Sequence, residues 1–222
     1  MNFIEKKIWS FWEQETSLTI LSVVLAVHIF IIIPLGEATI FGRTIFVIFY
    51  ILLLVAGMFV LLKNQRLSTI AMVLLVVLLA IMLFHSSGFE LLRDLITAVY
   101  CVLLGWVVLL RTFKKGPITT HRILGAIVVY LLLAFVFALL FHVTYIIYGP
   151  ESFKGLGIAD RKEFLYFSFT SLTSTGYGDI CPVAPFNRSL ANLEGLIGQL
   201  YPGIIIARLV SMEFESSRSK EI

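Results

Sequence analysis

The sequence predicts an all-α membrane protein with six transmembrane helices and one shorter helix that enters the membrane without crossing it. Hydrophobic residues make up 59% of the 222 residues and charged residues only 14%, a balance too apolar for one soluble core. The apolar residues also gather into six runs, each near the length that a helix needs to cross a bilayer. These runs cover approximately residues 18–35, 44–62, 67–84, 95–110, 123–147 and 190–210.

The segment before the first run, residues 1–17, carries charges of both signs and no small-residue cleavage site. It therefore does not have the pattern of a secretory signal. Apolar residues between the charges, among them Trp9 and Trp12, predict an amphipathic helix on the membrane surface. A polar lead-in with aromatic anchors at the interface is the alternative.

Short loops join the first four runs, which predicts antiparallel neighbours in a four-helix transmembrane domain over residues 18–112. The start of the fourth run is the least defined, because Glu90, Arg93 and Asp94 occupy what would be its first turns. Arg93 and Asp94 are expected to pair at the outer interface. His28 and His142 lie inside apolar runs, where hydrogen-bonded helix packing is expected rather than proton sensing.

The distribution of lysine and arginine predicts the orientation. With the N-terminus in the cytoplasm, 11 of these residues lie on the inner side and 6 on the outer side. Both termini, including a short tail at residues 214–222, are therefore expected in the cytoplasm, and the chain is expected to be a multi-pass protein of the cell (inner) membrane.

The stretch between the fifth and sixth runs differs in character. Glycines and a proline, from Gly149 to Gly157, indicate an irregular loop. Asp160 and Glu163 then have the spacing of a helix N-cap and its capping box. The apolar, hydroxyl-rich helix that follows, residues 164–173, is too short to span a bilayer and predicts a re-entrant segment.

Directly after this short helix comes Ser174-Thr-Gly-Tyr-Gly-Asp179. Non-helical backbone at membrane depth must be buried in protein or line water, and Gly176 and Gly178 can adopt conformations closed to other residues. A strand that alternates such conformations can direct successive carbonyl oxygens to one side. Four such strands around an axis would form rings of oxygens that replace the water shell of a potassium ion. Because the chain carries one such strand, a homotetrameric pore is predicted.

Residues 171–179, Ser-Leu-Thr-Ser-Thr-Gly-Tyr-Gly-Asp, resemble the signature T-x-x-T-V-G-Y-G-D of the potassium-channel superfamily. The resemblance covers about residues 123–210 and implies a pore domain, residues 117–213, that passively conducts K⁺. It implies that backbone carbonyls bind K⁺, with the Ser174 hydroxyl as the innermost ligand, and that the Tyr177 ring braces the strand against the pore helix. Asp179 would lie at the outer mouth and Thr173 would support the strand. The implied selectivity filter comprises Ser174, Thr175, Gly176, Tyr177 and Gly178, with K⁺ held by Ser174, Thr175, Gly176 and Tyr177.

Two departures from the family pattern bear on selectivity. Ser174 replaces the usual threonine but keeps its hydroxyl, and Thr175 replaces valine or isoleucine and needs a hydrogen-bond partner behind the filter. Thr170 stands where some bacterial members carry a glutamate paired with the aspartate, so that pairing is not expected. A weakly selective channel for K⁺ and Na⁺ is therefore the alternative function, and a non-conducting accessory membrane subunit is the alternative of another class.

The sixth run is expected to line the pore. Gly198 lies 19 residues after Asp179, an interval at which simple channels of this superfamily place a hinge glycine; a small residue for close helix packing is the alternative. Pro202 is expected to kink the helix, with Gln199, Pro202 and Ile206 facing the central cavity.

Glu194 is a carboxylate at membrane depth, where an unpaired charge is costly. It is expected to support the filter by bonding to pore-helix hydroxyls such as Ser168 or Ser171. The alternative is a residue near the outer interface that pairs with Arg188 or is hydrated.

The sequence lacks the features that are typical of several other functions. The fourth run contains no arginine between Arg93 and Arg111, so steep voltage gating is not expected. No nucleophile–base pair, metal cluster or phosphate loop suggests an enzyme, and a net charge of +3 does not suggest nucleic acid. Expected partners are further copies of the chain and membrane lipid, with no cofactor and no small ligand beyond monovalent cations. The gating stimulus stays open among the bilayer itself, pH acting through His121, and no gate beyond the filter.

Overall fold

The fold was described from a computed structural model of the chain, which defines residues 16–32, 48, 51–57, 65–84, 87–113, 119–157 and 161–218. Most of these residues are helical. Several predicted features lie outside the described part: most of the surface helix predicted at residues 1–17, most of the second apolar run, the proposed N-cap Asp160 and the side chain of His121.

The chain divides into two compact units. The first draws on the chain up to Val76, on Leu103–Lys114 and on Thr119–Leu131; the second draws on Val77–Val102, Lys115–Ile118 and Leu132–Ile222. The predicted boundary between residues 112 and 117 stays a prediction.

The first unit contains apolar helices. Helix α2 (Thr16–Val27) continues into a π-helical turn at His28–Ile32, and residues 51–57 are also helical. Later in this unit, Gly125 allows close contact with Thr112, because a β-carbon at Gly125 would overlap the threonine hydroxyl. A glycine is therefore required where these two helices approach each other.

In the part of the chain that the structure describes, three helices are long and apolar enough to cross a membrane. They are α6 (Glu90–Thr112), α7 (Thr120–Tyr148) and α9 (Pro185–Arg218), with qualifying segments Glu90–Thr112, Arg122–Tyr148 and Pro185–Phe214. Two shorter apolar helical segments, Leu18–Ile32 and Thr69–Ile81, lie in or near α2 and α5 (Gln65–Phe84). The described residues thus support a helical membrane protein, and the count of six spans stays a prediction.

Helix α6 begins at Glu90, five residues before the predicted run, and follows a short 3₁₀ turn at Ser87–Phe89. Its first turns tolerate the charged residues because Asp94 is buried against other charged side chains. Helix α9 likewise begins at Pro185, five residues before the sixth run, since proline is well suited to the first turn of a helix.

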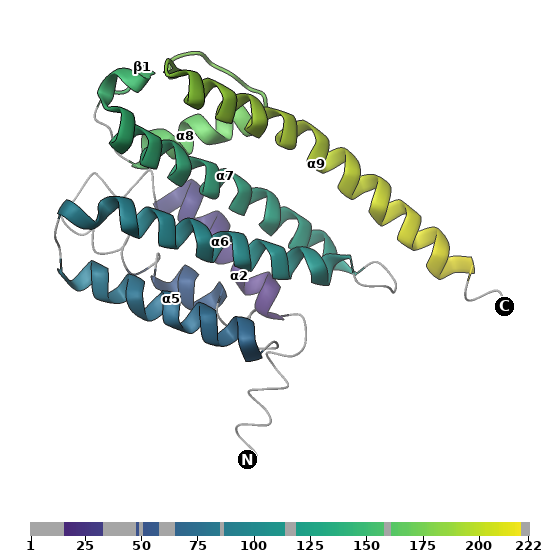
Figure 1. The fold of residues 1–222 in the computed structure, drawn as a ribbon. Coiled ribbons are helices and arrows are strands. Elements are labelled where there is room, and N and C mark those ends of the chain that lie inside the picture. The colour runs from purple at the N-terminus through teal and green to yellow at the C-terminus, as the bar shows by residue number, and fades with distance from the viewer. Residues whose placement is uncertain are drawn as a thin grey trace. The chain divides into compact units, whose positions relative to one another are not determined.

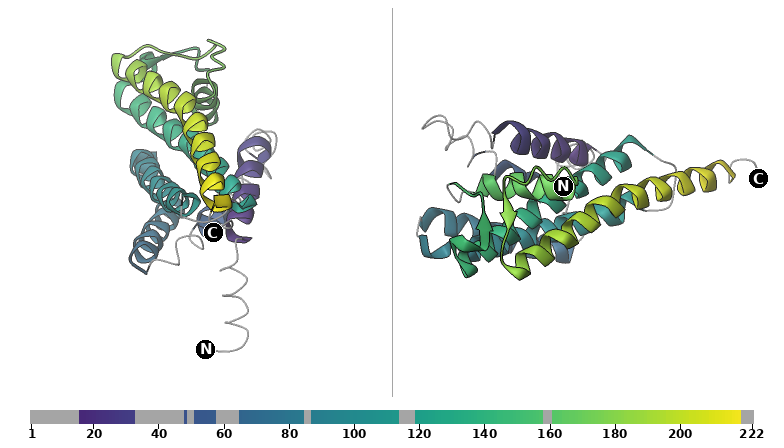
Figure 2. Two further views of the ribbon diagram at one scale, coloured as in Figure 1. Left: turned by 90° about the vertical axis from the view of Figure 1, so that its right-hand side faces the viewer. Right: turned by 90° about the horizontal axis from the view of Figure 1, so that it is seen from above.

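The second unit builds a short helix between two long ones (Figure 1). After α7 come a 3₁₀ turn (Pro150–Ser152), strand β1 (Phe153–Lys154), helix α8 (Arg161–Leu172), strand β2 (Cys181–Pro182) and α9. The two strands pair antiparallel, with Phe153 opposite Pro182 and Lys154 opposite Cys181, and lie side by side in Figure 2. The loop predicted as irregular is therefore partly ordered by pairing with the chain after α8.

Aromatic side chains form the core between α7 and α8. The Phe141 ring packs edge-to-face on Phe167 at a centroid distance of 4.9 Å, and Phe153 packs edge-to-face on Phe164 at 5.5 Å. Such offset and edge-to-face pairs add favourable quadrupole interactions to the burial of large rings. This core fixes α8 against α7 and so fixes the point at which the following segment begins.

Candidate functional site

The segment after α8 alternates two kinds of backbone conformation. The φ angles of Ser174, Gly176 and Gly178 are +57°, +56° and +77°, and neither residue between them has a positive φ. Ser174 is the one non-glycine residue with positive φ in the described part of the chain, in a region that costs an L-residue energy. This alternation is the conformation that the glycine spacing predicts.

The C-terminal end of α8 holds the start of this segment. The amides of Thr175 and Gly176 both donate to the carbonyl oxygen of Thr170, at 2.8 and 3.1 Å, and the Ser174 amide donates to Ser171 at 3.0 Å. The helix therefore supplies acceptors for the first three amides. The short apolar helix does not simply precede the segment but fixes its conformation.

Thr175 has the hydrogen-bond partner that its position requires. The Thr173 hydroxyl lies 2.6 Å from the carbonyl oxygen of Phe169, to which it donates, and 2.8 Å from the Thr175 hydroxyl. Because Thr173 has a single hydroxyl hydrogen, Thr175 is the donor of the second bond. Thr173 thus contacts Thr175 in the segment after α8, whereas its role in supporting a filter stays a prediction.

The C-terminal end of the segment is held by a tyrosine that the sequence reasoning missed. The Tyr166 hydroxyl donates to Asp179 Oδ2 at 2.7 Å, and the Tyr166 ring stacks on Tyr177 at a centroid distance of 6.2 Å with parallel planes. Tyr177 therefore packs on α8, as predicted. An aromatic hydroxyl on α8, 13 residues before Asp179, was the available signal, but sequence alone does not specify a contact over that separation.

This hydrogen bond affects the ionisation of both groups. The Tyr166 hydroxyl lowers the pKa of Asp179, while the neighbouring carboxylate raises the pKa of Tyr166 to about 12. Asp179 is therefore ionised at neutral pH and places a negative charge at this end of the segment.

The loop after α7 supports the same end. Gly155 has a φ of +88°, and a β-carbon there would collide with the carbonyl oxygen of Asp179. The carbonyl oxygen of Ser152 accepts hydrogen bonds from the amides of Val183 and Ala184, at 2.9 and 3.2 Å. The backbone at and after Asp179 is thereby fixed by residues from the loop after α7.

Helix α9 packs closely on the C-terminal end of α8. A β-carbon at Gly198 would collide with the carbonyl oxygen of Leu172 and would lie 2.7 Å from its carbonyl carbon. Helix α9 continues through Gly198 and through Pro202. Gly198 therefore has the close-packing role that was the alternative prediction, whereas its action as a hinge stays a prediction.

Two polar residues of α9 face α8 and the segment after it. Gln199 Nε2 donates to the Ser174 hydroxyl oxygen at 3.0 Å. Glu194 is fully buried and its Oε1 forms a hydrogen bond with the Ser168 hydroxyl, the predicted contact. Arg188 instead donates to the carbonyl oxygen of Pro182. Ile206, further along α9, is 62% exposed in the single chain.

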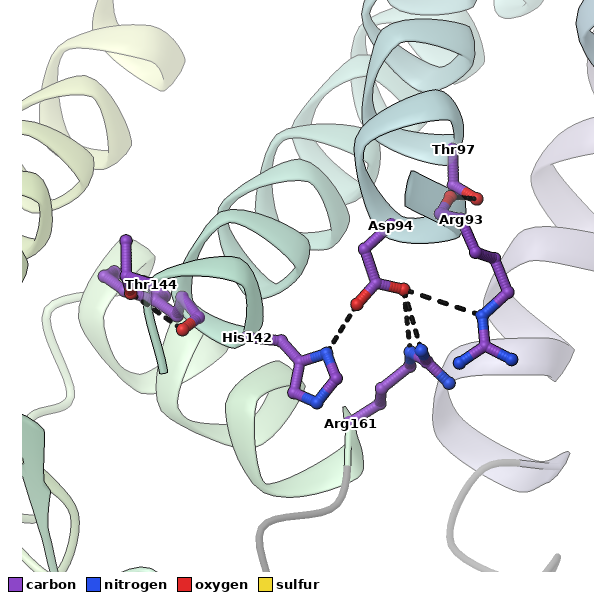
Figure 3. Close-up of polar contacts among 7 residues, drawn as sticks. Arg93, Asp94, Thr97, His142, Thr144 and Arg161 are labelled. Atoms are coloured by element: carbon purple, nitrogen blue, oxygen red, sulfur yellow. Dashed lines mark hydrogen bonds and ion pairs between the residues drawn. The ribbon is translucent and has the colours of Figure 1, made fainter. Parts of the chain in front are cut away.

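A cluster of charged residues joins three helices of the second unit (Figure 3). Asp94 of α6, 1% exposed, receives two contacts of 2.9 Å from the guanidinium of Arg161, the first residue of α8. His142 Nδ1 of α7 lies 2.5 Å from the other carboxylate oxygen, and Arg93 lies further away at 3.8 Å. The expected Arg93–Asp94 pair is present, but Asp94 chiefly binds residues that the sequence reasoning did not connect to it. His142 is a hydrogen-bonded packing residue, as predicted.

Comparisons with known proteins address the same region. Residues 125–215 match a family model described as an ion channel. Protein LctB of Geobacillus stearothermophilus is 37% identical over 70 residues, covering 32% of this chain and 49% of the relative. Protein LctB of Bacillus caldotenax is 34% identical over 62 residues, covering 28% and 46%.

The chain thus spans about half the length of the curated relatives it matches. No solved structure gave a significant match. The matched segment contains α8, the alternating strand and most of the two long helices that flank them. Residues 125–215 are therefore similar to the domains of an ion-channel family.

Proposed function

We propose that four copies of this chain form a potassium-selective channel that passively conducts K⁺ across the cell membrane. The observation that supports this proposal most strongly is the backbone alternation, in which Ser174, Gly176 and Gly178 have positive φ angles and the residues between them do not. Alternating left-handed residues turn successive carbonyl groups toward one side of a strand, and rings of such carbonyls can replace the hydration shell of K⁺. The proposed K⁺ ligands are the carbonyl oxygens of residues 174–177 and the Ser174 hydroxyl.

The surrounding contacts support these roles. The Ser174 hydroxyl oxygen accepts a hydrogen bond from Gln199, which orients it at the end of the strand proposed to face the cavity. Asp179, at the opposite end, is exposed and its pKa is lowered, so it would attract cations. Glu194 and Thr173 would support the filter from behind through their contacts with Ser168 and Thr175.

The bonding of Thr175 favours selectivity for K⁺ over the weakly selective alternative. Its hydroxyl donates to Thr173, so the polar group has a protein partner. A satisfied hydroxyl does not need an ion or water as its partner. We therefore propose that Thr175 contributes its carbonyl, and not its side chain, to ion binding.

The exposed apolar surface of α9 supports assembly in a membrane. Ile204, Ile206 and Phe214 are between 61% and 73% exposed in the single chain, a state that water does not favour. Lipid and neighbouring subunits would cover Ile204 and Phe214, whereas Ile206 would face the central cavity with Pro202. The orientation with both termini in the cytoplasm belongs to this proposal.

The charged residues of α6 do not favour steep voltage gating. Between Asp94 and Arg111 the helix has no charged residue, and its buried charge is the carboxylate of Asp94. A membrane potential acts strongly only on a helix that carries several mobile charges. Conduction would therefore vary weakly with voltage.

Flux from the purified chain in liposomes tests the proposal. We expect reversal potentials to follow the K⁺ gradient and not the Na⁺ gradient. Gly178→Ala should abolish flux while leaving the tetramer intact: a β-carbon at Gly178 meets no atom of the same chain, but the positive φ becomes strained, at a cost of roughly 1–2 kcal/mol. Gly157→Ala is the matched control, because Gly157 also meets no neighbour and lacks a positive φ.

Each other outcome contradicts part of the proposal. Reversal potentials that depend equally on Na⁺ would indicate a weakly selective cation channel. Absence of flux from a folded, assembled protein would indicate an accessory subunit. Flux that survives Gly178→Ala would show that the alternating strand does not conduct the ion.

A further inference from the structure

Ser168 connects three helices of the second unit at one point. Its hydroxyl lies 2.7 Å from the backbone carbonyl oxygen of Ala134 in α7 and also contacts Oε1 of Glu194 in α9. Ser168 and Glu194 are both fully buried. The contact lies directly behind the proposed filter, because Glu194 is one helical turn before Gly198, which packs on the end of α8.

The number of hydrogen atoms available at Ser168 limits how its two contacts can form. Two close oxygen–oxygen contacts require two hydrogens, one for each bond. A backbone carbonyl is an acceptor only, and a serine hydroxyl carries a single hydrogen. If Ser168 donates to Ala134, the hydrogen in the Ser168–Glu194 contact must come from the carboxyl group of Glu194.

The environment of Glu194 also disfavours its ionised form. Oε2 has no hydrogen-bond partner among the described residues, and the carboxyl group is fully buried. No charged or titratable side chain of α7, α8 or α9 in the described part of the chain pairs with it. An ionised carboxylate with one hydrogen bond and no counter-charge would be costly at this depth.

We propose that Glu194 is a neutral carboxylic acid that donates its proton to Ser168, which in turn donates to Ala134. This proton-dependent latch, the chain Glu194–Ser168–Ala134, holds the pore helix α8 to both long helices of the ion-channel domain. Removal of the proton at alkaline pH takes away one of the two hydrogens and leaves a buried charge. Alkaline pH therefore loosens the packing behind the filter and lowers conduction.

Infrared spectroscopy of the purified, folded tetramer tests the protonation without requiring conduction. At neutral pH we expect a C=O stretching band of a protonated carboxylic acid. The band should disappear in Glu194→Gln and persist in Glu213→Gln, since Glu213 lies on the same helix but is exposed. Absence of the band in the wild type, or its persistence in Glu194→Gln, would overturn the proposal.

A second variant keeps the test decisive if Glu194→Gln does not fold. Ser168→Ala removes the acceptor of the carboxylic acid and leaves the acid itself in place. The band should then shift to higher frequency, as expected for a carboxylic acid that has lost its hydrogen-bond partner. An unchanged band would mean that the protonated group is not bonded to Ser168.

The functional consequence is tested by the pH dependence of flux. Glutamine keeps an N–H donor for Ser168 and has no proton to lose in the alkaline range. With each flux normalised to its value at neutral pH, Glu194→Gln should therefore lack the alkaline loss, whereas Glu213→Gln should retain it. If Glu194→Gln abolished flux at neutral pH in a folded tetramer, a charged Glu194 would be required and the latch would be wrong. If no variant conducts, the proposed function fails while the infrared result still stands.

Discussion

Thr173 and Thr175 illustrate how the filter sequence accommodates an unusual hydroxyl. A valine or isoleucine at residue 175 would need no hydrogen-bond partner, whereas threonine does. The partner is two residues away on the same strand, at 2.8 Å, and is itself tied to α8 through Phe169. The two threonines therefore act as a pair, and a substitution of one is best interpreted together with the other.

We predict that Thr173→Val lowers selectivity for K⁺ over Na⁺. The Thr175 hydroxyl would lose its acceptor, at a cost of about 1–3 kcal/mol once neighbouring subunits bury it, and would turn toward water or ions. The double variant Thr173→Val/Thr175→Val removes both hydroxyls and should restore selectivity. Reversal potentials in opposed K⁺ and Na⁺ gradients measure both effects, and equal selectivity in the single and double variants would contradict the pairing.

Tyr166 lowers the pKa of Asp179, and the pH dependence of K⁺ flux can show this effect. The lowered pKa of Asp179 means that the stabilisation of its carboxylate is fully present above the ordinary carboxyl pKa and is lost as the pH falls through the lowered value. Tyr166→Phe keeps the ring but removes the hydroxyl, so the pKa should rise toward its ordinary value. Acid on the outer side should then inhibit K⁺ flux at a higher pH than in the wild type.

The matched control for this prediction is Tyr148→Phe, which removes a hydroxyl from an exposed tyrosine with no bond to Asp179. Its acid inhibition should coincide with that of the wild type. Identical profiles for Tyr166→Phe and the wild type would show that the tyrosine does not set the charge at the mouth.

At the scale of elements, α8 is held by contacts with three different helices. Aromatic packing and Ser168 fix it to α7, Gly198 and Glu194 fix it to α9, and Arg161 fixes its first turn to Asp94 of α6. A short helix has little stability of its own. These contacts explain why residues 161–172 form a helix that positions the filter.

We predict that Asp94→Ala destabilises the protein by about 2–4 kcal/mol, because it leaves His142 and Arg161 without their buried acceptor. This loss of unfolding free energy is smaller than the loss expected for a fully buried ion pair, because Arg161 is one-third exposed. Thermal unfolding in detergent measures the change. Glu90→Gln, at an exposed residue of the same helix, should leave the unfolding temperature unchanged; a similar effect of both variants would exclude a specific role for Asp94.

The parts of this site that could be predicted from the sequence are those encoded locally. The short helix α8 and the alternating backbone at residues 174–178 follow from composition, glycine spacing and a short motif. The contact of Glu194 with Ser168 was also predictable, since a buried carboxylate requires a nearby hydroxyl. By contrast, the Tyr166–Asp179 and Asp94–Arg161 bonds and the requirement for Gly155 depend on how helices and loops pack. Residues separated by 13 or 67 positions have no sequence pattern that brings them together.

At the scale of the whole molecule, one chain alone does not enclose the proposed filter segment. Residues 173–179 are exposed, although the ion-binding role proposed for them requires a dry environment that excludes competing water. The exposed apolar side chains of α9 also need surroundings that exclude water. Both features are explained if neighbouring subunits surround one axis, as the proposed tetramer does.

Mixed assemblies test the number of subunits directly. We predict that co-expression of equal amounts of wild-type and Gly178→Ala chains leaves roughly one sixteenth of the wild-type K⁺ flux, because random assembly of four chains gives that fraction of tetramers without a defective strand. A dimeric pore would leave roughly one quarter and a monomeric pore roughly one half. Flux from purified assemblies in liposomes, normalised to the amount of protein, measures the fraction, with Gly157→Ala as the control that should leave flux unreduced. Half of the flux remaining would contradict a shared pore, because each chain would then conduct alone.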